Sequence, residues 1–202
     1  MIDPTIAVAF ITGVLGPVSV LVIKHYVEKH KQKPDMITEA LEMSEKVVSK
    51  LEIIKEEYHA DRVWITQFHN GGHFYPTGKS MAKFSVIYET VGVGVKSIQS
   101  NFQSIPVNLF SKSINYLLEH DVIGIPDYKD ETVATHGLKY IAEDTGCKSG
   151  YLFTIKTIEG KYIATLGLDY TKKKVKLNPE DIMHLSVHAS AIGGVLSGQL
   201  DL

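Results

Sequence analysis

The sequence has a single cysteine, Cys147. One thiol excludes an internal disulfide framework and any zinc site built from several cysteines. It fits a reducing compartment, although folded domains in oxidising spaces also occur without cysteine pairs. Because no signal of a lowered pKa surrounds it, we interpret Cys147 as an inert small residue rather than a redox sensor.

An excess of charge of either sign is also lacking. The chain has 21 lysines and arginines against 23 aspartates and glutamates, for a net charge of −2. No general basic field therefore attracts nucleic acid, and we expect no nucleic-acid partner. The 44% hydrophobic content excludes a disordered chain, and 202 residues suffice for one domain with an anchor and a connector.

Signatures of catalysis are missing as well. The sequence contains neither GxSxG nor GxxxxGK[ST], and the pair Gly92 and Gly94 lacks a third glycine. His184 and His188 are spaced for one helix face, but the segment HLSVH has no HExxH glutamate, which favours the polar flank of an amphipathic helix. We predict a protein that is not an enzyme, with no catalytic residues and no bound metal.

The sequence does contain a long uncharged run, from Thr5 to Ile23. At about 1.5 Å per residue the run covers roughly 28 Å, close to the hydrocarbon thickness of a bilayer. Only Asp3 carries side-chain charge before it, whereas lysines follow it at positions 24, 29, 31 and 33. The positive-inside rule then predicts a single-pass anchor (residues 1–24) in the inner (cytoplasmic) membrane, with the N-terminus outside and the C-terminal domain cytoplasmic. The lipid bilayer is thus an expected partner.

Residues 25–61 are interpreted as a juxtamembrane and connector segment, with one long amphipathic helix over 35–61. Its apolar positions recur every three or four residues, interrupted at Ser44: Ile37, Ala40, Val47, Leu51, Ile54 and Tyr58. We expect the first half of the helix to pair with a second chain, giving a homodimer through anchor and connector, and the second half to pack on a sheet. Packing alone, in a monomer, is the alternative.

Residues 62–202 alternate between strand and helix patterns. Strands are predicted over 62–69, 83–90, 122–125, 150–158 and 162–170, with a turn at 70–72 and a hairpin loop at 159–161. Helices are predicted over 97–102, 107–120 and 132–145, and a last one begins at Asn178-Pro179-Glu180-Asp181. This order favours an α/β (α+β) domain, in which helices flank a central antiparallel sheet of about five strands and the first and last helices share one face.

Residues 40–200 resemble the GAF domain family. The resemblance rests on the strand RVWITQFH after a long helix, the segment IGIPD at 123–127, the hairpin strand IATLGLDY at 163–170, and the closing helix. It implies a sensor, with either a small-molecule pocket between the sheet and the middle helices or a pocketless role in dimerisation. The family's cyclic-nucleotide motif is absent and no cysteine is suitably placed for bilin attachment, so the sequence names no cofactor.

The densest polar and aromatic cluster, QFHNGGHFY, spans residues 67–75. A strand that opens into a glycine-rich loop can present two imidazoles and an amide at a pocket mouth, and a metal there needs a third ligand such as Asp127, His136 or Asp169. A tight turn is the preferred interpretation of the loop itself. The candidate ligand-binding residues are Gln67, His69, Asn70, His73, Tyr75, Tyr88, Asp127 and Asp169.

Three functions fit these patterns. The first is a membrane-tethered, GAF-like sensory or regulatory module that binds a small ligand or a protein partner. The second follows from a similarity to small membrane proteins of tailed phages: a lysis regulator resembling T-type holins, whose globular domain is periplasmic, although the lysines after the span favour the opposite orientation. The third is a ligand-free membrane scaffold. The lysine-rich segment 172–176 is interpreted as a solvated loop, with contact to anionic headgroups as the alternative.

Overall fold

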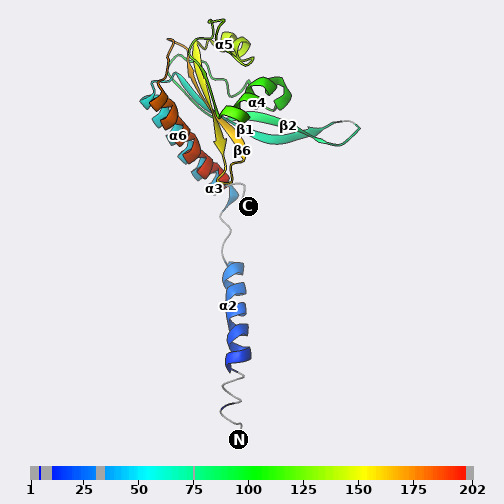
Figure 1. The fold of residues 1–202 in the computed structure, drawn as a ribbon. Coiled ribbons are helices and arrows are strands. Elements are labelled where there is room, and N and C mark those ends of the chain that lie inside the picture. Colours follow the sequence, from blue (N-terminus) through cyan, green and yellow to red (C-terminus); the bar gives the residue numbers. More distant parts are fainter. Residues whose placement is uncertain (1–4, 6–10, 31–34, 75, 199–202) are drawn as a thin grey trace. The chain divides into compact units, whose positions relative to one another are not determined.

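The protein is described by a computed structural model that covers residue 5 and residues 11–30, 35–74 and 76–198 (Figure 1). The chain divides into two compact units, Met1–Ala40 and Leu41–Leu202.

The first unit contains a π-helical segment, η1 (Ile11–Leu15), followed by α2 (Gly16–His30). Within the described ranges, no helix combines the length and the apolar character needed to cross a bilayer. The helix α2 has 15 residues and includes Lys24, whereas about 20 apolar residues are needed. The predicted span is therefore not confirmed, and residues 6–10 of it lie outside the described residues.

The second unit is built on a six-stranded sheet in the order β3-β2-β1-β6-β5-β4, with every neighbouring pair antiparallel. The strands are β1 (Arg62–His73), β2 (Ser80–Val91), β3 (Ile105–Pro106), β4 (Val122–Ile125), β5 (Ser149–Lys156) and β6 (Tyr162–Tyr170). The predicted number of about five strands is corrected to six, because β3 has only two residues and two residues cannot show an alternating pattern.

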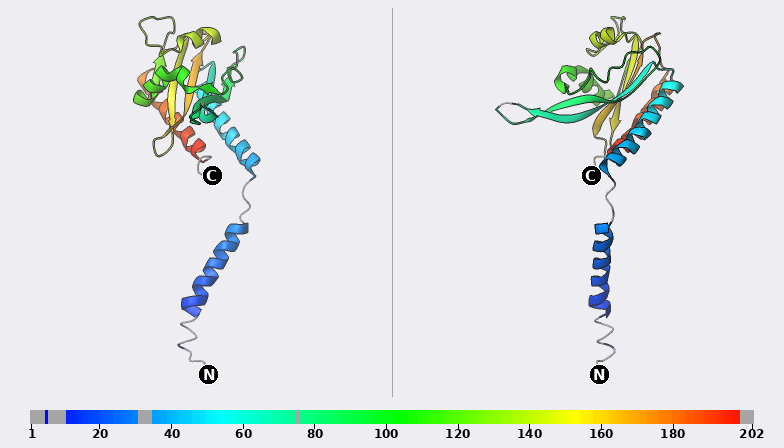
Figure 2. Two further views of the ribbon diagram at one scale, coloured as in Figure 1. Left: turned by 90° about the vertical axis from the view of Figure 1, so that its right-hand side faces the viewer. Right: turned by 180° about the vertical axis from the view of Figure 1, so that it is seen from behind.

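Helices lie on both faces of this sheet. They are α3 (Met36–Glu57), the 3₁₀ turn η2 (Val107–Phe110), α4 (Ser111–His120), α5 (Lys139–Thr145) and α6 (Pro179–Ser197). In the two views of Figure 2, α3 and α6 cover one face while α4 and α5 lie over the other. The predicted placement of the first and last helices on a common face is confirmed.

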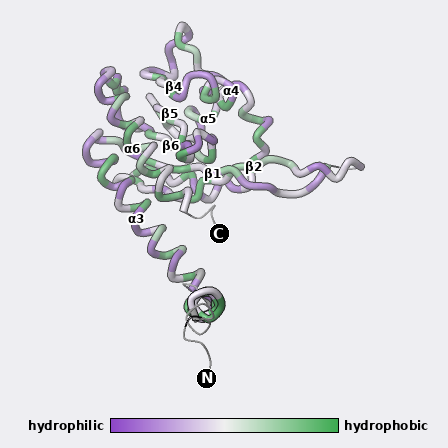
Figure 3. The backbone as a smooth tube through the Cα atoms, turned by 60° about the horizontal axis from the view of Figure 1, so that its bottom comes forward, coloured by the Kyte–Doolittle hydropathy of each residue, from purple (hydrophilic) through white to green (hydrophobic). Residues whose placement is uncertain are grey.

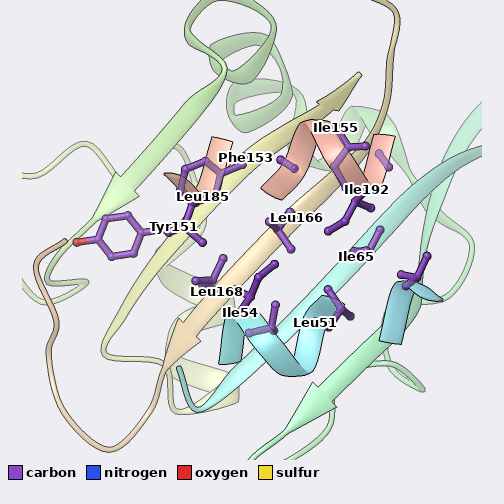
Figure 4. Packing of buried hydrophobic residues seen from close by; sticks show 14 of the residues in the cluster. Leu51, Ile54, Ile65, Tyr151, Phe153, Ile155, Leu166, Leu168, Leu185 and Ile192 are labelled. Carbon is purple, nitrogen blue, oxygen red and sulfur yellow. The ribbon is translucent and has the colours of Figure 1, made fainter. Parts of the chain in front are cut away.

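The face under α3 and α6 holds the larger hydrophobic core. Leu51 and Ile54 from α3 and Leu185 and Ile192 from α6 meet the inward side chains of β1, β5 and β6 (Figure 4). Hydrophilic and hydrophobic positions alternate along α3 (Figure 3), as its three-four spacing requires. The second half of this helix thus packs on the sheet as predicted.

Two apolar side chains near the start of α3 are uncovered: Ile37 is 69% exposed and Leu41 is 61% exposed, whereas Met43 already belongs to the core. The pairing of this half with a second chain stays a prediction.

The start of α6 agrees with its sequence signal. The Asn178 side chain accepts a 2.8 Å hydrogen bond from the backbone N–H of Asp181, and the Asp181 carboxylate accepts one from the backbone N–H of Asn178 at 3.2 Å. This reciprocal pair satisfies two N–H groups that the helix itself leaves without partners. The cap fixes where α6 begins and so which of its faces meets the sheet.

Two predicted helices are wrong or shortened. Residues 97–102 form turns, because the Glu89 carboxylate accepts backbone N–H bonds from Ile98 (2.8 Å) and Gln99 (3.2 Å) and so ties this segment to β2. The predicted helix over 132–145 begins only at Lys139. Upstream, Asp130 accepts bonds from both the backbone and the hydroxyl of Thr132, a local pattern that competes with helix.

The predicted turn at residues 70–72 is also wrong. There β1 continues through His73, with an irregular register between Asn70 and His73, and Gly72 has φ of 72°. The chain reverses further on, where the N–H of Phe74 donates to the carbonyl of Lys79. A glycine with positive φ is thus accommodated within a strand as an irregularity rather than as the end of the strand.

Candidate functional site

A cavity lies on the face of the sheet that carries α4 and α5. Its enclosed volume is about 90 Å³. The whole space between its walls, including the part that opens to solvent, is about 770 Å³. Six aromatic side chains line its walls: Trp64, Phe68, Phe84, Phe102, Phe110 and Tyr128. A pocket between the sheet and the middle helices is what the resemblance to GAF domains implied, but His69, Asn70, Tyr88 and Asp127, near which the cavity was expected, do not line it.

Strand alternation explains how one sheet has both a core and a cavity. In β1, Arg62, Trp64 and Thr66 line the cavity, whereas Val63 and Ile65 belong to the opposite core. Successive side chains of a strand point to opposite faces, so one strand supplies both.

An irregularity in β2 adjusts this pattern. Ile65 pairs with Tyr88 but the next residue, Thr66, pairs with Val86, so β2 has one extra residue at this point. Ile87 and Tyr88 consequently both pack against the α3/α6 core, and Val86 faces the cavity. An inserted residue of this kind re-aims the side chains that follow it.

The polar floor of the cavity is a buried ion pair between Arg62 and Asp169, to which the indole N–H of Trp64 also donates. The Asp169 atom Oδ2 accepts bonds from Arg62 Nε at 2.8 Å and from Trp64 Nε1 at 2.9 Å, and lies 2.6 Å from Arg62 Nη2. Arg62, only 1% exposed, uses its third nitrogen to donate to the carbonyl of Lys96 at 2.8 Å. The two charges offset each other and the floor is electrically neutral.

Two glycines permit this arrangement. A Cβ at Gly167 would lie 2.2 Å from the Trp64 ring, so the indole rests directly on the backbone of β6. A Cβ at Gly150 would lie 2.9 Å from the Tyr128 hydroxyl and 3.3 Å from Asp169 Oδ1. Glycine at both positions lets bulky cavity residues approach the sheet closely.

The remaining titratable groups around the cavity are neutral at pH 7. Burial raises the pKa of the Cys147 thiol well above its usual range, and the nearby Asp169 charge raises it further. The same two causes, in the same order, raise the pKa of Tyr128. Burial raises the pKa of Tyr162, behind the cavity wall, to about 12. Cys147 is therefore a protonated thiol rather than a nucleophile, in line with its interpretation as inert.

Of the residues singled out from the sequence, Asp169 lines the cavity. Tyr88 packs against the opposite core. Gln67 lies between Thr66 and Phe68, which both line the cavity, so its own side chain belongs to the other face of the strand. Asp127 lies on the loop after β4, where its carboxylate pairs with Lys174 at 2.5 Å.

The other candidates lie beyond the sheet. The strand β1 pairs with β6 only as far as Gln67, and from there β1 and β2 continue as a two-stranded projection (Figure 1). His69, Asn70 and His73 are exposed on it, and His69 Nε2 lies 2.9 Å from Ser85 Oγ. Tyr75 lies outside the described residues. The structure therefore does not gather the predicted set around one point.

His136, named as a metal candidate, packs against Tyr116 with ring centroids 4.0 Å apart and the rings tilted by 42°. Tyr116 in turn packs against His120, with centroids 4.3 Å apart and a tilt of 47°. Burial, and then the neighbouring His120, lower the pKa of His136. In the part of the chain that the structure describes, no three histidine, cysteine, aspartate or glutamate side chains are grouped to hold a metal ion.

Sequence reasoning missed Arg62, Trp64 and the phenylalanines of the cavity. One signal was available for Arg62: it opens a predicted strand, and Asp169, its partner in the register, lies one residue before the end of another. A charged residue on a strand buried on both faces needs a partner of opposite charge. Phe110 lies on the apolar face of the predicted helix 107–120, whereas Phe102 gave no usable signal because residues 97–102 form turns rather than the predicted helix.

Comparison with solved structures identifies the architecture. The protein is similar to the GAF3 domain of Slr1393 from Synechocystis sp. PCC6803 in its photoproduct state, with a TM-score of 0.58 and 15% identity over 78% of this chain and 96% of that one. It is also similar to a far-red cyanobacteriochrome photoreceptor, with a TM-score of 0.61 and 14% identity over 94% of this chain and 100% of that one.

The fold is GAF-like. A further neighbour is the phycocyanobilin-bound GAF domain of a cyanobacterial phytochrome, with a TM-score of 0.59 and 16% identity over 78% of this chain and 85% of that one. The sequence itself matches no protein-family model and no curated protein. At these identities the likeness concerns the fold, and it gives no support to the phage lysis-protein alternative.

Proposed function

We propose that this GAF-like protein is a non-enzymatic sensory module whose cavity binds a small, largely apolar ligand. The observation that carries the proposal is the cavity itself: aromatic walls around a neutral, internally hydrogen-bonded floor. Concave, mostly apolar pockets with a few placed polar groups are the usual form of small-molecule sites. That a similar GAF domain holds phycocyanobilin agrees with ligand binding on this fold.

The polar groups of the cavity favour binding over catalysis. A general base or nucleophile needs a free lone pair near a reacting atom and a pKa suited to proton transfer. The Asp169 oxygen that faces Arg62 and Trp64 accepts from both, and the Cys147 thiol donates to the carbonyl of Ser149 at 3.0 Å. Because these polar groups are already hydrogen-bonded to the protein, they hold the cavity walls in position rather than act on a substrate.

The only tryptophan, Trp64, lies in the cavity wall and reports its occupancy. Bromobenzene, a neutral aromatic whose heavy atom quenches indole fluorescence on contact, is expected to quench Trp64 with a saturable binding curve. The variant Ala142→Leu fills part of the cavity from α5, and we expect it to weaken this binding by about tenfold or more, because the added methylenes occupy the ligand's space.

The matched control is Ala191→Leu, the same change on the exposed face of α6, which should leave the titration unchanged. Quenching that rises linearly without saturation, or that is equal in the two variants, would show collision from solvent and refute ligand binding in the cavity.

We also propose that residues 5–23 tether the module to the inner membrane. Support comes from the uncharged run in the sequence and from the exposed apolar side chains of α2, among them Leu21 and Ile23. Alkaline phosphatase and a fluorescent protein, each fused after Leu202 and expressed in a bacterium, test the orientation. Fluorescence in the membrane fraction without phosphatase activity is expected; the reverse pattern would place the domain outside the cytoplasm and revive the lysis-regulator alternative.

A further inference from the structure

We infer that the ligand of this cavity is a neutral single-ring aromatic molecule that carries one O–H or N–H donor, as a phenol does, and that Ser113 accepts its hydrogen bond. The inference rests on the proposed ligand-binding function and narrows it to a chemical class. Three features of the cavity carry it: the balance of charge, the direction in which the wall hydroxyls are already used, and the shape of the walls.

Charge excludes ionic ligands. Asp169 and Arg62 are the only ionisable lining residues that are charged, and they satisfy each other. A carboxylate or ammonium group entering the cavity would lose its hydration without gaining a free counter-charge. It could gain one only by breaking the Arg62–Asp169 pair, which would leave the other member buried and unpaired. A neutral ligand meets neither penalty.

Two of the wall hydroxyls are placed to accept a hydrogen bond from a ligand. The Ser113 hydroxyl, on α4, donates its proton to the carbonyl of His136 at 2.8 Å, and the Thr145 hydroxyl, on α5, donates to the carbonyl of Ile141 at 2.8 Å. A hydroxyl has one proton and two lone pairs. With the proton committed, each of these two oxygens can still accept, so a ligand O–H or N–H has a partner on α4 or α5.

Ser113 is the stronger of the two acceptors. It is buried, it lies between the cavity-lining residues of α4, and its bond to the carbonyl of His136 fixes the direction of its lone pairs. Burial in an apolar wall raises the cost of an unpaired polar group, so a matching donor on the ligand matters more here than at the surface.

The walls set the size and shape. Phe84 and Phe110 meet edge to face at 5.3 Å between ring centroids, and Trp64 lies flat against β6. Aromatic walls favour a planar ring, which stacks or packs edge-on against them. The enclosed room of about 90 Å³ is smaller than an engineered cavity of about 150 Å³ that takes up benzene. A single ring therefore also needs part of the space that opens to solvent, and a second fused ring would need still more of it.

The test compares phenol, toluene and benzoate on the full chain. Each is titrated for its ability to displace bromobenzene and so restore Trp64 fluorescence. Phenol and toluene are expected to bind, with benzoate at least about tenfold weaker than phenol because of its charge. In Ser113→Ala the affinity for phenol should fall about tenfold, since its O–H is left unpaired, while the affinity for toluene changes less than about twofold.

Toluene binding also shows that the variant is folded. The matched control is Ser186→Ala, which removes a hydroxyl with the same kind of bond, to the carbonyl of Ile182 at 3.0 Å, but on α6 at the opposite face; it should leave all three affinities unchanged. Equal loss of phenol and toluene in Ser113→Ala, unaltered phenol binding, or benzoate binding as tight as phenol would each overturn the ligand class. If bromobenzene still binds in those cases, ligand binding in the cavity stands and only the ligand class is refuted. If bromobenzene does not bind to the unaltered protein at all, the proposed function itself is refuted.

Discussion

Replacing Asp169 with leucine is expected to lower the free energy of unfolding by about 3–5 kcal/mol. The substitution leaves the Arg62 guanidinium, 1% exposed, in the sheet without its counter-charge and removes the acceptor of the Trp64 N–H. Urea denaturation followed by far-UV circular dichroism measures the loss. In the double variant Arg62→Met/Asp169→Leu most of it should return, because a pair of apolar side chains carries no buried charge.

The matched control is Lys156→Met, which breaks the ion pair with Asp121 at the protein surface. Surface pairs of this kind contribute less than about 1 kcal/mol. If Asp169→Leu and Lys156→Met cost the same, or if the double variant is no more stable than Asp169→Leu, the buried pair does not have the role assigned to it here.

The second large effect concerns two adjacent glycines of α6. A Cβ at Gly193 would lie 2.3 Å from the backbone carbonyl oxygen of Lys156 on β5, whereas a Cβ at Gly194 meets nothing within 4 Å. Gly193→Ala is expected to destabilise the fold by about 1–3 kcal/mol, since α6 must move away from the sheet. Gly194→Ala should stabilise it by roughly 0.5–1 kcal/mol, because alanine loses less backbone entropy in a helix.

The opposite signs make the pair its own control, and thermal unfolding of the two single variants measures both. Equal effects of one sign would mean that α6 does not approach β5 as closely as the structure has it. The prediction matters for function because α6 and β5 belong to the core that supports the sheet from behind the cavity.

The two faces of the sheet differ in how completely they are packed. The α3/α6 face carries most of the buried hydrophobic side chains, whereas the smaller cluster on the α4/α5 face surrounds the cavity. An unfilled cavity costs packing energy, so the cavity face depends on the other face for stability. If a ligand binds as proposed, it would stabilise the folded state by an amount that grows with its affinity.

Much of the fold followed from local patterns. The strands at 122–125 and 162–170 were predicted with the bounds that the structure gives, and the cap of α6 and the packing half of α3 were read from residue type and spacing. These predictions succeeded because propensity, capping and periodicity are properties of a few neighbouring residues. The resemblance to GAF domains agrees with the fold that the comparisons show.

The candidate site was much less accessible from the sequence. A polar, glycine-rich cluster drew attention to residues 67–75, yet its described members from His69 to Phe74 lie beyond the six-stranded part of the sheet. Of the predicted site residues that the structure describes, only Asp169 lines the cavity. Tyr88 faces the opposite core because one extra residue in β2 shifts the alternation. Such an irregularity has no reliable local signature, since it is stabilised by contacts on both sides of the sheet.

The sequence by itself determined the longer strands, the first and last helices of the domain with their apolar faces, and that no motif of a known catalytic class is present. Only the tertiary structure decided that Arg62 and Asp169, 107 positions apart, form one neutral floor, and that irregular residues such as Phe102 complete a cavity wall. The physical reason is the range of the interactions. Burial patterns and caps act between neighbours in the chain, whereas a cavity exists only where distant side chains fail to fill the space between them.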